Sequence, residues 1–509
     1  MKKIQNVLIS VYNKSEILPI AKLFKKLKIT IISTGGTQKF LEQHNIPINS
    51  VEDITAYPSI LGGRVKTLHP KVFGGILSRS DNKSDQMDLD KFNIKTIDMV
   101  IVDLYPFQAT LMNTQNHKEI IEKIDIGGVS LIRAAAKNYV ETLVVSSMED
   151  INDAAKLIKQ NDGQTTLEDR LNFAQKSFVT TSNYELAISK YFDSKIQKNN
   201  ILPSMFKKNI VDAQWLRYGE NPHQEGVFYG DITQNFEQLN GKQLSYNNLL
   251  DLDAAISLIE EFSTTSFGIF KHNNACGFAS DNNITKAWAK ALAADPISAF
   301  GGVLVTNDTI NYEVAQQINK LFFEILIAPK FEKKALELLK SKKNRIILKK
   351  KNTNLEQVSF RTVLNGVLCQ QKDHKDGKET IEVVSKVKVS KTQMEDLIFA
   401  NKICKHTKSN AIILAKNKQL LGSGCGQTSR IDALKHAIAK AKQFSLNLEN
   451  AAMASDAFFP FPDCVEIANS EGVKTIIQPG GSKNDNLSID YCNNNDMAMI
   501  FTNTRHFKH

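Results

Sequence analysis

The sequence predicts an α/β protein of more than one domain, and two observations support that prediction. Over the first 150 residues, short apolar runs typical of buried strands alternate with stretches whose apolar residues recur at helical spacing. The chain has 509 residues, which is too long for one ordinary core because a domain averages roughly 150 residues. Alternation of strand and helix predicts a mostly parallel sheet with helices on both faces, and ligand sites at the carboxyl ends of its strands.

Four apolar runs are the expected strands of the first region, and helical stripes separate them. The runs are 7–11, 29–32, 99–104 and 142–145. Aliphatic residues dominate each run, as in strands that are buried on both faces. A second α/β region follows, with strands expected at 267–270, 302–305, 411–414 and 475–477.

Changes in this pattern predict the domain boundaries. Between 148 and about 192 one broad apolar stripe recurs at helical spacing, so a helical connector is expected there. We therefore expect a first domain at 1–147, the connector at 148–200 and a second domain at 201–509. The second domain is large for a single core, so two subdomains are expected, with the lysine-rich stretch 340–351 as a surface boundary between them.

Composition excludes several classes of protein. Hydrophobic residues make up 42% and charged residues 23%, the balance of a folded globular protein rather than a disordered one. The longest apolar runs are far shorter than the ~18 residues of a membrane span, and the first residues lack the apolar segment of a signal peptide. None of the six cysteines forms a Cys-x-x-Cys pair, which argues against a zinc ribbon or thioredoxin-type site and favours a reducing cytoplasm.

The net charge of +10 suits polyanionic partners, either nucleic acid or small phosphorylated substrates. Lys349–Lys351 is one of the lysine-rich stretches that carry the excess, and no aromatic residues interleave with it. Such a run is more typical of a solvated surface than of a nucleic-acid interface. Nucleic-acid binding is therefore the non-enzymatic alternative, and it predicts a strongly salt-dependent affinity for a duplex.

Three glycine-led polar loops in the first region indicate a phosphate-ester site. They are Ser33-Thr34-Gly35-Gly36-Thr37, Gly62-Gly63-Arg64-Val65-Lys66-Thr67-Leu68-His69-Pro70 and Asp125-Ile126-Gly127-Gly128. Glycines let the backbone approach a ligand closely, and a helix N-terminus offers free N–H groups to an anion. The third loop opens a helix on which Arg133 and Lys137 share a face. An ordinary strand–helix turn explains one such loop, but not three in one small domain.

In the second region, Lys271-His272 directly follows the apolar run 267–270. This pair suits acyl transfer, with the imidazole as the base and the ammonium group as the stabiliser of the oxyanion. Adjacent side chains on a strand point to opposite faces, so the two can act together only where the strand has ended. On spacing alone, a structural histidine is equally consistent with the pattern.

From end to end, the chain resembles the bifunctional enzymes of purine biosynthesis that combine AICAR (phosphoribosylaminoimidazolecarboxamide) formyltransferase with IMP cyclohydrolase. The cyclohydrolase motifs are Ser10-Val11 with Lys14, the three loops above as far as Lys137, and Leu104-Tyr105-Pro106-Phe107. The formyltransferase motifs include Arg217-Tyr218-Gly219-Glu220-Asn221-Pro222-His223, Lys271-His272-Asn273-Asn274-Ala275-Cys276-Gly277, Gly424-Cys425-Gly426-Gln427-Thr428-Ser429-Arg430 and Ser455-Asp456-Ala457-Phe458. The resemblance implies a methylglyoxal-synthase-like first domain with a parallel sheet, and a larger second domain of two cytidine-deaminase-like subdomains.

The resemblance also implies which residues form each site. In the cyclohydrolase domain the implied catalytic residues are Lys66, Tyr105, Asp125 and Lys137. The implied substrate-binding residues there are Ser10, Lys14, Ser33, Thr34, Gly35, Gly36, Thr37, Arg64, Thr67, Gly127 and Gly128. In the formyltransferase domain the implied catalytic residues are Lys271, His272 and Asn410. The implied AICAR-binding residues are Arg217, Tyr218, Gly301, Glu324, Arg430 and Arg505, and the implied folate-binding residues are Ile431, Phe458, Asp463 and Gln478.

Together these residues imply a cytoplasmic enzyme that transfers a formyl group from 10-formyltetrahydrofolate to AICAR, releases tetrahydrofolate, and cyclises formyl-AICAR to IMP with loss of water. The resemblance implies a homodimer that uses reduced folate as a co-substrate, with no tightly bound cofactor, no metal, and no nucleic-acid or membrane partner. The sequence departs from the family pattern at Asn13, Phe73, Asp103, Ala275, Cys425 and Pro462. A carboxylate at position 103 would repel the substrate phosphate if it faced the site.

A zinc-dependent nucleobase deaminase is the enzymatic alternative, because its fold matches the implied subdomains. Such an enzyme needs a His-x-Glu segment followed by Pro-Cys-x-x-Cys, and the sequence contains no Pro-Cys-x-x-Cys. A third alternative is a bifunctional fold in which one of the two sites is inactive. The principal motif residues of both sites are present, which favours two working sites.

Overall fold

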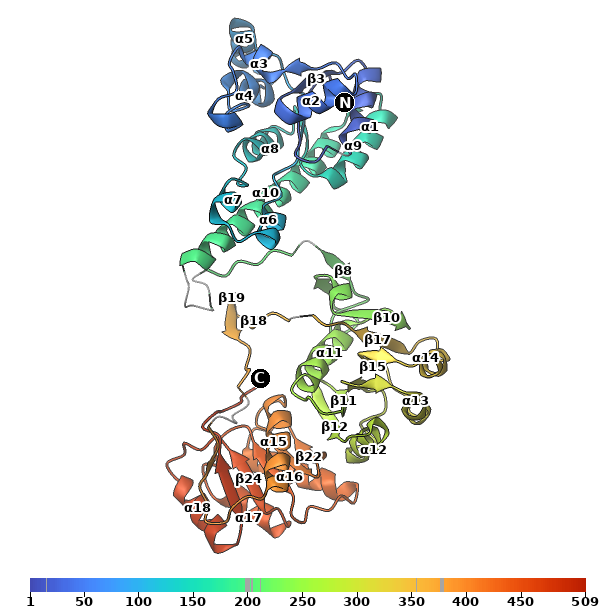
Figure 1. Ribbon diagram of the computed structural model, residues 1–509, viewed down its shortest axis with the longest axis vertical. Helices are drawn as coiled ribbons and strands as arrows, with labels where there is room; N and C mark the ends of the chain where they lie inside the picture. Colours follow the sequence, from blue (N-terminus) through green and yellow to red (C-terminus); the bar gives the residue numbers. More distant parts are fainter. Residues whose placement is uncertain (15, 197–201, 203–204, 211, 354, 376–379) are drawn as a thin grey trace. The chain divides into compact units, whose positions relative to one another are not determined.

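The computed structural model describes residues 1–14, 16–196, 202, 205–210, 212–353, 355–375 and 380–509. The chain divides into two compact units, which we call unit 1 (Met1–Asn209) and unit 2 (Ile210–His509) (Figure 1). Each unit has its own main sheet and its own hydrophobic cores. No helix among the described residues is long and apolar enough to cross a membrane.

The main sheet of unit 1 is parallel, with strand order β4-β3-β2-β5-β6. Its strands are β2 (Asn6–Ser10), β3 (Thr30–Ser33), β4 (Asn49–Ser50), β5 (Met99–Val102) and β6 (Leu143–Val145), while β1 (Lys2–Lys3) and β7 (Gln164–Thr165) form a separate pair. The apolar residues of β2 and β5 are buried, as expected where helices cover both faces of a sheet. The predicted parallel α/β arrangement is confirmed, although β4 was not among the predicted strands.

Helices cover both faces of this sheet. They are α1 (Ile17–Lys26), α2 (Gly35–Gln43), α3 (Val51–Thr55), α4 (Pro70–Leu77), α5 (Lys83–Phe92), α6 (Phe107–Asn113), α7 (His117–Ile121), α8 (Gly127–Lys137), α9 (Met148–Gln160) and α10 (Leu167–Ile196). On one face α1 and α9 bury Phe24 and Ile158, and on the other α4 and α8 bury Val72 and Ile132. Both α9 and α10 fall within the range predicted as a connector (148–200, of which 197–200 lie outside the described residues), and both belong to unit 1.

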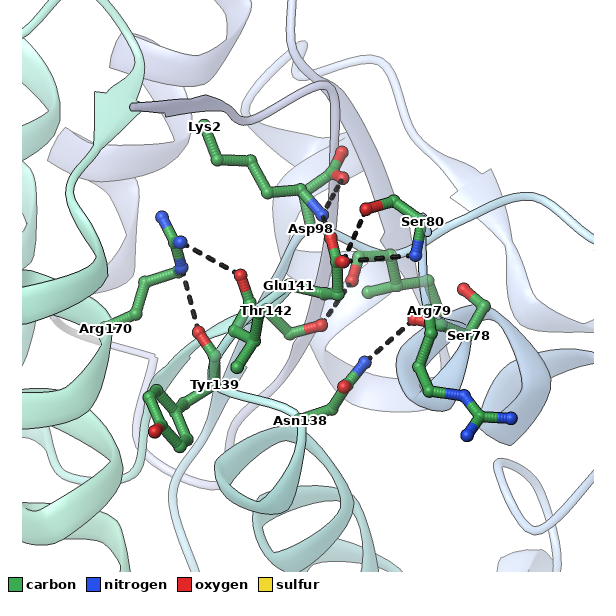
Figure 2. Close-up of polar contacts among 12 residues, drawn as sticks. Lys2, Ser78, Arg79, Ser80, Asp98, Asn138, Tyr139, Glu141, Thr142 and Arg170 are labelled. Atoms are coloured by element: carbon green, nitrogen blue, oxygen red, sulfur yellow. Dashed lines mark hydrogen bonds and ion pairs between the residues drawn. The ribbon is translucent and has the colours of Figure 1, made fainter. Parts of the chain in front are cut away.

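A polar network ties together the edge of this sheet at which β5 and β6 begin (Figure 2). The Asp98 carboxylate accepts hydrogen bonds from the backbone N–H groups of Gln5 (2.9 Å) and Asn6 (3.0 Å). Arg170 of α10, which is 6% exposed, donates to the carbonyl groups of Tyr139 and Val140, both at 2.9 Å. These contacts fix α10 beside the start of β6. The side chains of the candidate site lie at the opposite edge of the sheet, where the strands end.

Unit 2 is built from two halves that repeat the same sequence of elements. The first half comprises β10 (Phe236–Asn240), α11 (Tyr246–Ile259), β11 (Ser266–Lys271), β12 (Asn274–Ser280), α12 (Ile284–Ala294), β13 (Val303–Thr306), α13 (Tyr312–Ile318), β15 (Ile325–Ala328), α14 (Lys333–Lys340) and β17 (Ile346–Lys350). The second comprises β20 (Glu382–Val383), α15 (Lys391–Lys405), β21 (Ile412–Lys416), β22 (Gln419–Gly424), α16 (Arg430–Gln443), β23 (Ala452–Ser455), α17 (Asp463–Ser470), β24 (Thr475–Gln478), α18 (Asp485–Asn494) and β25 (Ala498–Phe501).

The two halves share one sheet of order β10-β17-β15-β13-β11-β12-β22-β21-β23-β24-β25-β20. The β12–β22 junction, where Ala279 pairs with Gln419, joins the two halves. Counted outward from this junction, parallel and antiparallel strand pairs occur in the same order in both halves. The prediction of two subdomains agrees with this repeat, while their cytidine-deaminase-like character stays a prediction. Shorter elements lie outside this sheet: β8 (Ala213–Trp215), β9 (Val227–Tyr229), β14 (Thr309–Ile310), β16 (Lys330–Phe331) and the hairpin β18 (Val358–Val363) with β19 (Gly366–Gln371).

Helices pack on both faces of this long sheet. In Figure 1, α11 lies on one side of β15 and β17, and α13 and α14 lie on the other. Apolar residues of α11 and α15 share one core, whereas α12–α14 and α16–α18 cover separate cores. Glycine permits the closest of these contacts, since a Cβ at Gly277 would lie 2.1 Å from the Ala291 carbonyl oxygen, and one at Gly424 would lie 1.8 Å from that of Ala433.

The lysine-rich stretch 340–351 is not the surface boundary that the sequence predicts. Its apolar residues, Ile346, Ile347 and Leu348, are fully buried in β17. Lysines outnumber the three consecutive aliphatic residues in this stretch, so its composition is that of a surface segment. The three aliphatic residues nevertheless pair in register with β15. The composition therefore concealed a core strand.

Candidate functional site

In unit 1, the loop from Ser33 to Thr37 connects β3 to α2 at the carboxyl edge of the sheet. Its three hydroxyl groups are buried and engaged within the protein. Ser33 Oγ donates to the Ile9 carbonyl (2.8 Å), and Thr37 Oγ1 donates to the Val11 carbonyl (2.9 Å). Thr34 Oγ1 donates to Glu52 (3.0 Å). The Ser33 and Thr37 hydroxyls therefore hold the loop against the end of β2, the Thr34 hydroxyl ties it to α3, and the loop presents the N–H groups that open α2 to an anion.

Two lysine side chains lie against the glycine pair of this loop. A Cβ at Gly35 would lie 2.9 Å from Lys66 Nζ, and one at Gly36 would lie 3.4 Å from Lys14 Cε. Lys14 comes from the turn after β2, where its Nζ donates to the Tyr12 carbonyl (3.0 Å). Two ammonium groups and a helix N-terminus thus converge, which is the combination that binds a phosphate.

The loop that opens α8 reaches the same place. Thr67 Oγ1 would lie 3.2 Å from a Cβ at Gly127, so the loop carrying Lys66 contacts the start of α8 directly. Asp125 accepts a hydrogen bond from the Gly128 N–H (2.7 Å), and its own N–H donates to the Tyr184 hydroxyl (2.8 Å). Burial raises the pKa of Asp125, and the nearby Asp103 carboxylate raises it further.

An aromatic pair borders this carboxylate. The rings of Tyr12 and Tyr105 meet edge to face with centroids 5.5 Å apart, and Lys123 Nζ lies 5.3 Å from the first ring centroid and 5.7 Å from the second. Burial raises the pKa of the Tyr105 hydroxyl, and the Asp125 charge adds to the effect. The Tyr105 side chain therefore remains a proton donor at neutral pH.

The carboxylate of Asp103, one of the departures from the family pattern, accepts hydrogen bonds from the backbone N–H groups of Tyr12 and Asn13 (2.9 Å for the latter). Burial raises its pKa, while these hydrogen bonds and Lys14 oppose the increase. Asp103 is thus engaged with the turn that carries Lys14. Phe73, a second departure, packs in the apolar core beneath α4 and α8.

Not every implied residue of unit 1 lies in this cluster. Lys137 is the last residue of α8, and at 1.5 Å rise per residue it lies about 15 Å along the helix from Gly127. There it lines a cavity of about 570 Å³ with Leu171 and Phe178 of α10. Arg64 lies on the surface in an ion pair with Glu122. Ser10 is the last residue of β2 and pairs with Val102 of β5.

In unit 2, Lys271 ends β11 and His272 occupies the turn to β12. His272 and Asn273 both have left-handed backbone (φ 52° and 65°), as in a two-residue hairpin turn. The strand therefore ends at Lys271, and His272 in the turn is not bound by the alternation that would place it on the face opposite Lys271. Lys271 Nζ donates to the Phe300 carbonyl (2.8 Å), and the Asn273 N–H donates to Asp251 Oδ1 (2.7 Å).

Asp251, on α11, is a site residue that the sequence analysis missed. Burial raises its pKa, and the charges of His272 and Glu324 act on it with opposite signs, so the three groups are neighbours. Glu324 precedes β15 and accepts a hydrogen bond from the Asn248 amide (3.0 Å). Gly301 lies beside them, with its N–H donating to the Phe322 carbonyl (2.8 Å). No motif marks Asp251, because only packing of α11 on the sheet brings it to this edge.

The segment carrying Asn410 reaches the same edge from the second half of unit 2, because the Lys408 N–H donates to Asn274 Oδ1 (3.1 Å). Asn410 Oδ1 accepts from Arg430 (2.8 Å), and Arg430 also donates to the buried Asp456 (3.0 Å). The Asn410 amide is held further by donation of its Nδ2 to the Gln427 carbonyl (2.9 Å). Asn410 and Arg430 thus form one fixed pair.

The remaining implied residues of unit 2 lie on several separate elements. Arg217 and Tyr218 follow β8 as a stacked pair, with 5.6 Å from the guanidinium to the ring centroid. Arg505 packs on the Phe507 ring at 4.4 Å. Ile431 lies in the first turn of α16, Phe458 follows β23 and is 38% exposed, Asp463 opens α17, and Gln478 ends β24 fully buried. Printed bonds nevertheless link several of these elements to the surroundings of the His272 turn: Arg430 at the start of α16 bonds to Asn410, and Ser409 N–H donates to the Lys508 carbonyl near Arg505 (2.9 Å).

Comparison with known proteins gives matches over the whole chain. The family model described as the AICARFT/IMPCHase bienzyme matches residues 135–440, and the model of the MGS-like domain matches residues 16–130. A bifunctional purine biosynthesis protein PurH from Bacteroides thetaiotaomicron is 51% identical, covering 100% of this chain and 99% of that protein. Those of Caldicellulosiruptor saccharolyticus and Aquifex aeolicus are 45% and 43% identical, each over 99% of this chain and 100% and 99% of their own lengths.

Proposed function

Because the chain belongs to the family of AICARFT/IMPCHase bienzymes, we propose that its two units divide the two reactions of the family, with ring closure in unit 1 and formyl transfer in unit 2. The protein is a bifunctional enzyme of purine biosynthesis that transfers a formyl group to AICAR and cyclises formyl-AICAR to IMP with loss of water. Folate is the formyl-carrying co-substrate, and 10-formyltetrahydrofolate is the form that we propose. The observation that carries the division is the pair of separate polar clusters, around Lys66 in unit 1 and His272 in unit 2.

In ring closure, the carboxamide nitrogen of formyl-AICAR attacks the formyl carbon, and the resulting carbinolamine loses water as the formamide nitrogen gives up its proton and the C=N bond forms. We assign the phosphate to Lys14, Lys66 and the N–H groups that open α2, on the grounds of their convergence. Tyr105, whose raised pKa keeps it protonated, donates to the departing oxygen. Asp125 lies beside it and accepts the proton released by the carboxamide nitrogen.

In formyl transfer, the 5-amino group of AICAR attacks the formyl carbon, and a tetrahedral intermediate collapses to release tetrahydrofolate. We assign removal of the amino proton to His272, which the hairpin turn holds at the open edge of the sheet, and return of that proton to the departing N10 nitrogen of tetrahydrofolate. Lys271 and Asn410 would stabilise the oxyanion. Support for this arrangement comes from the hydrogen bond between Lys408 and Asn274, which brings the Asn410 segment to the His272 turn.

The assembly and location are proposed on the resemblance alone. We propose a cytoplasmic homodimer with formyltransferase sites built across the subunit interface.

One coupled assay tests the proposed function. Purified protein is incubated with AICAR and 10-formyltetrahydrofolate, and tetrahydrofolate, formyl-AICAR and IMP are separated by chromatography. We expect equal amounts of tetrahydrofolate and IMP with little formyl-AICAR remaining. Formyl-AICAR accumulating alone would mean that unit 1 does not close the ring, and folded protein that forms no tetrahydrofolate would contradict the formyltransferase assignment.

Replacing Asp103 by asparagine should shift the pH dependence of ring closure. Burial and the Asp103 charge both raise the pKa of Asp125, and the proposed mechanism needs Asp125 ionised. Asp103→Asn removes the like charge, so the pKa of Asp125 falls and the acidic limb of the profile moves to lower pH. The profile of kcat/KM for added formyl-AICAR reports this, because it follows ionisations of the free enzyme. A limb that stays in place or moves to higher pH would contradict the assignment.

A further inference from the structure

Unit 2 contains a cavity of about 490 Å³ at the edge of its sheet where β15 and β17 begin. Two loops form most of its wall, one following α13 and the other following α14. Five of the lining residues are cationic: Lys242, Lys320, Lys342, Lys343 and Arg345. Glu324 is the one acidic residue among those that line it. The lining of the cavity therefore carries an excess of positive charge.

Arg345 is the most unusual of these cations because it is only 7% exposed. Its Nη1 donates to Asn319 Oδ1 (2.7 Å) and to the Leu339 carbonyl (3.3 Å), and its guanidinium lies 4.3 Å from the Phe323 ring centroid. Burial lowers its pKa, with no opposing carboxylate. All of these partners are neutral, so within the described part of the chain a buried cation lacks a counter-ion. Such an arrangement is costly unless an anion completes it.

The lysines of the same wall are also unpaired. None of the four forms an ion pair with an acidic side chain of the described residues, although lysines nearby on β17 do. Glu324 offsets at most one of the five positive charges of the lining, and its Oε2 accepts a hydrogen bond from the Asn248 amide (3.0 Å). Phe322, which also lines the cavity, is 56% exposed, and its ring centroid lies 5.0 Å from that of Phe300.

We propose that this cavity binds the diphosphate group of a small anion, with Arg345, Lys342 and Lys343 as its cationic partners. Guanidinium and ammonium groups bind phosphoryl oxygens, and three such groups around one cavity are enough to contact two adjacent phosphoryl groups at once. The group comes either from inorganic diphosphate or from a nucleoside di- or triphosphate, whose base would stack on Phe322. The site is separate from the phosphate contacts assigned to AICAR and to formyl-AICAR above.

The cavity is also coupled to formyl transfer, since Glu324 lines it and belongs to the implied AICAR-binding residues. The loop that carries Glu324 also holds Gly301, through the bond from the Gly301 N–H to the Phe322 carbonyl. An anion on Arg345 would therefore change the surroundings of Glu324. Ligands that share such a residue alter each other's affinity by the same factor.

Calorimetric titration of the full-length protein, without AICAR or folate, tests the site directly. Inorganic diphosphate and ADP are the two probes, and we expect saturable binding of at least one. Lys342→Gln/Lys343→Gln should weaken it by about tenfold or more, because two charge-assisted contacts are lost. The matched control is Lys333→Gln/Lys334→Gln, which removes the same charge from the exposed first turn of α14 and should leave the affinity unchanged. Arg345→Met, which keeps most of the side-chain volume, should abolish binding.

The outcomes separate the alternatives. Equal affinity for the two probes would identify diphosphate itself as the ligand, and tighter binding of ADP would identify a nucleotide. Absence of saturable binding, or equal weakening in both double variants, would overturn the proposal, because the charge would then act only nonspecifically. Complete competition by AICAR together with an unaffected Lys342→Gln/Lys343→Gln variant would overturn it too, by assigning the anion to the AICAR site. No turnover is measured, so failure here is distinct from failure of the proposed function.

Discussion

Replacing His272 by alanine should lower the rate of formyl transfer by about 10²–10⁴-fold, the usual contribution of a general base. Ring closure of added formyl-AICAR should be unchanged, since the groups assigned to it all lie in unit 1. The variant should fold normally, because His272 occupies a turn rather than the core. Initial rates of tetrahydrofolate release and of IMP formation, measured separately on the same preparation, check both parts of the prediction.

A matched substitution controls for general effects of losing an imidazole. His374 is exposed and is assigned to neither site, so His374→Ala should retain both activities. Asp251→Asn is informative as well, because Asp251 accepts the hydrogen bond from Asn273 that fixes the turn. It should reduce formyl transfer less than His272→Ala does, since the asparagine oxygen can still accept that bond. Loss of ring closure in His272→Ala would show that the two sites are not independent.

The fold of unit 1 follows closely from its sequence because its signals are local. Strands such as β5 consist entirely of buried aliphatic residues, and a helical stripe follows each of the early strands. The long sheet of unit 2 was harder to predict, since β12 contains Gly277 and β17 carries lysines at its end. These strands are recognisable only through the partners beside them, and those partners are far away in the sequence.

In the candidate sites too, residues marked by a local motif could be predicted, whereas contacts between residues distant in the sequence could not. Loops such as Ser33–Thr37 could be recognised from glycine and hydroxyl spacing, but the sequence did not reveal that the hydroxyls bond to groups of the protein, at the end of β2 and on α3, rather than face a ligand. The position of Lys137 at the far end of α8 follows from helix geometry, yet motif resemblance had grouped it with Asp125. Asp251 carries no motif at all, because only tertiary packing places it beside His272.

Replacing Glu261 by glutamine should destabilise unit 2 by about 3–5 kcal/mol, the usual effect of breaking a buried ion pair. Glu261 follows α11 in the first half, and its Oε1 accepts from Lys405 Nζ (2.8 Å) and His406 Nε2 (3.1 Å) at the end of α15 in the second. The Lys405 side chain is only 3% exposed, so the glutamine variant would leave a buried ammonium group without its counter-ion. The pair also joins two halves whose strands, among the described residues, meet only at the β12–β22 junction.

The effect should depend on pH in a defined direction. Burial opposes ionisation of Glu261, but the hydrogen bonds from His406 and Lys405 outweigh it and lower its pKa to about 2. A carboxyl group whose pKa is lower in the folded state contributes stability above its unfolded pKa, ~4.3 for glutamate, and loses it as the pH falls. The difference between wild type and Glu261→Gln should therefore be full at neutral pH and shrink between about pH 4.3 and pH 2.

Urea unfolding followed by tryptophan fluorescence measures this difference in unit 2 alone, because both tryptophans, Trp215 and Trp288, lie there. Glu260→Gln is the matched control: the neighbouring carboxylate pairs with Lys350 nearer the surface, so its loss should cost about 1 kcal/mol or less. The double variant Glu261→Leu/Lys405→Met should recover much of the stability, since apolar groups can replace a buried ion pair. Equal losses for Glu260→Gln and Glu261→Gln would show that the buried pair does not hold the two halves together.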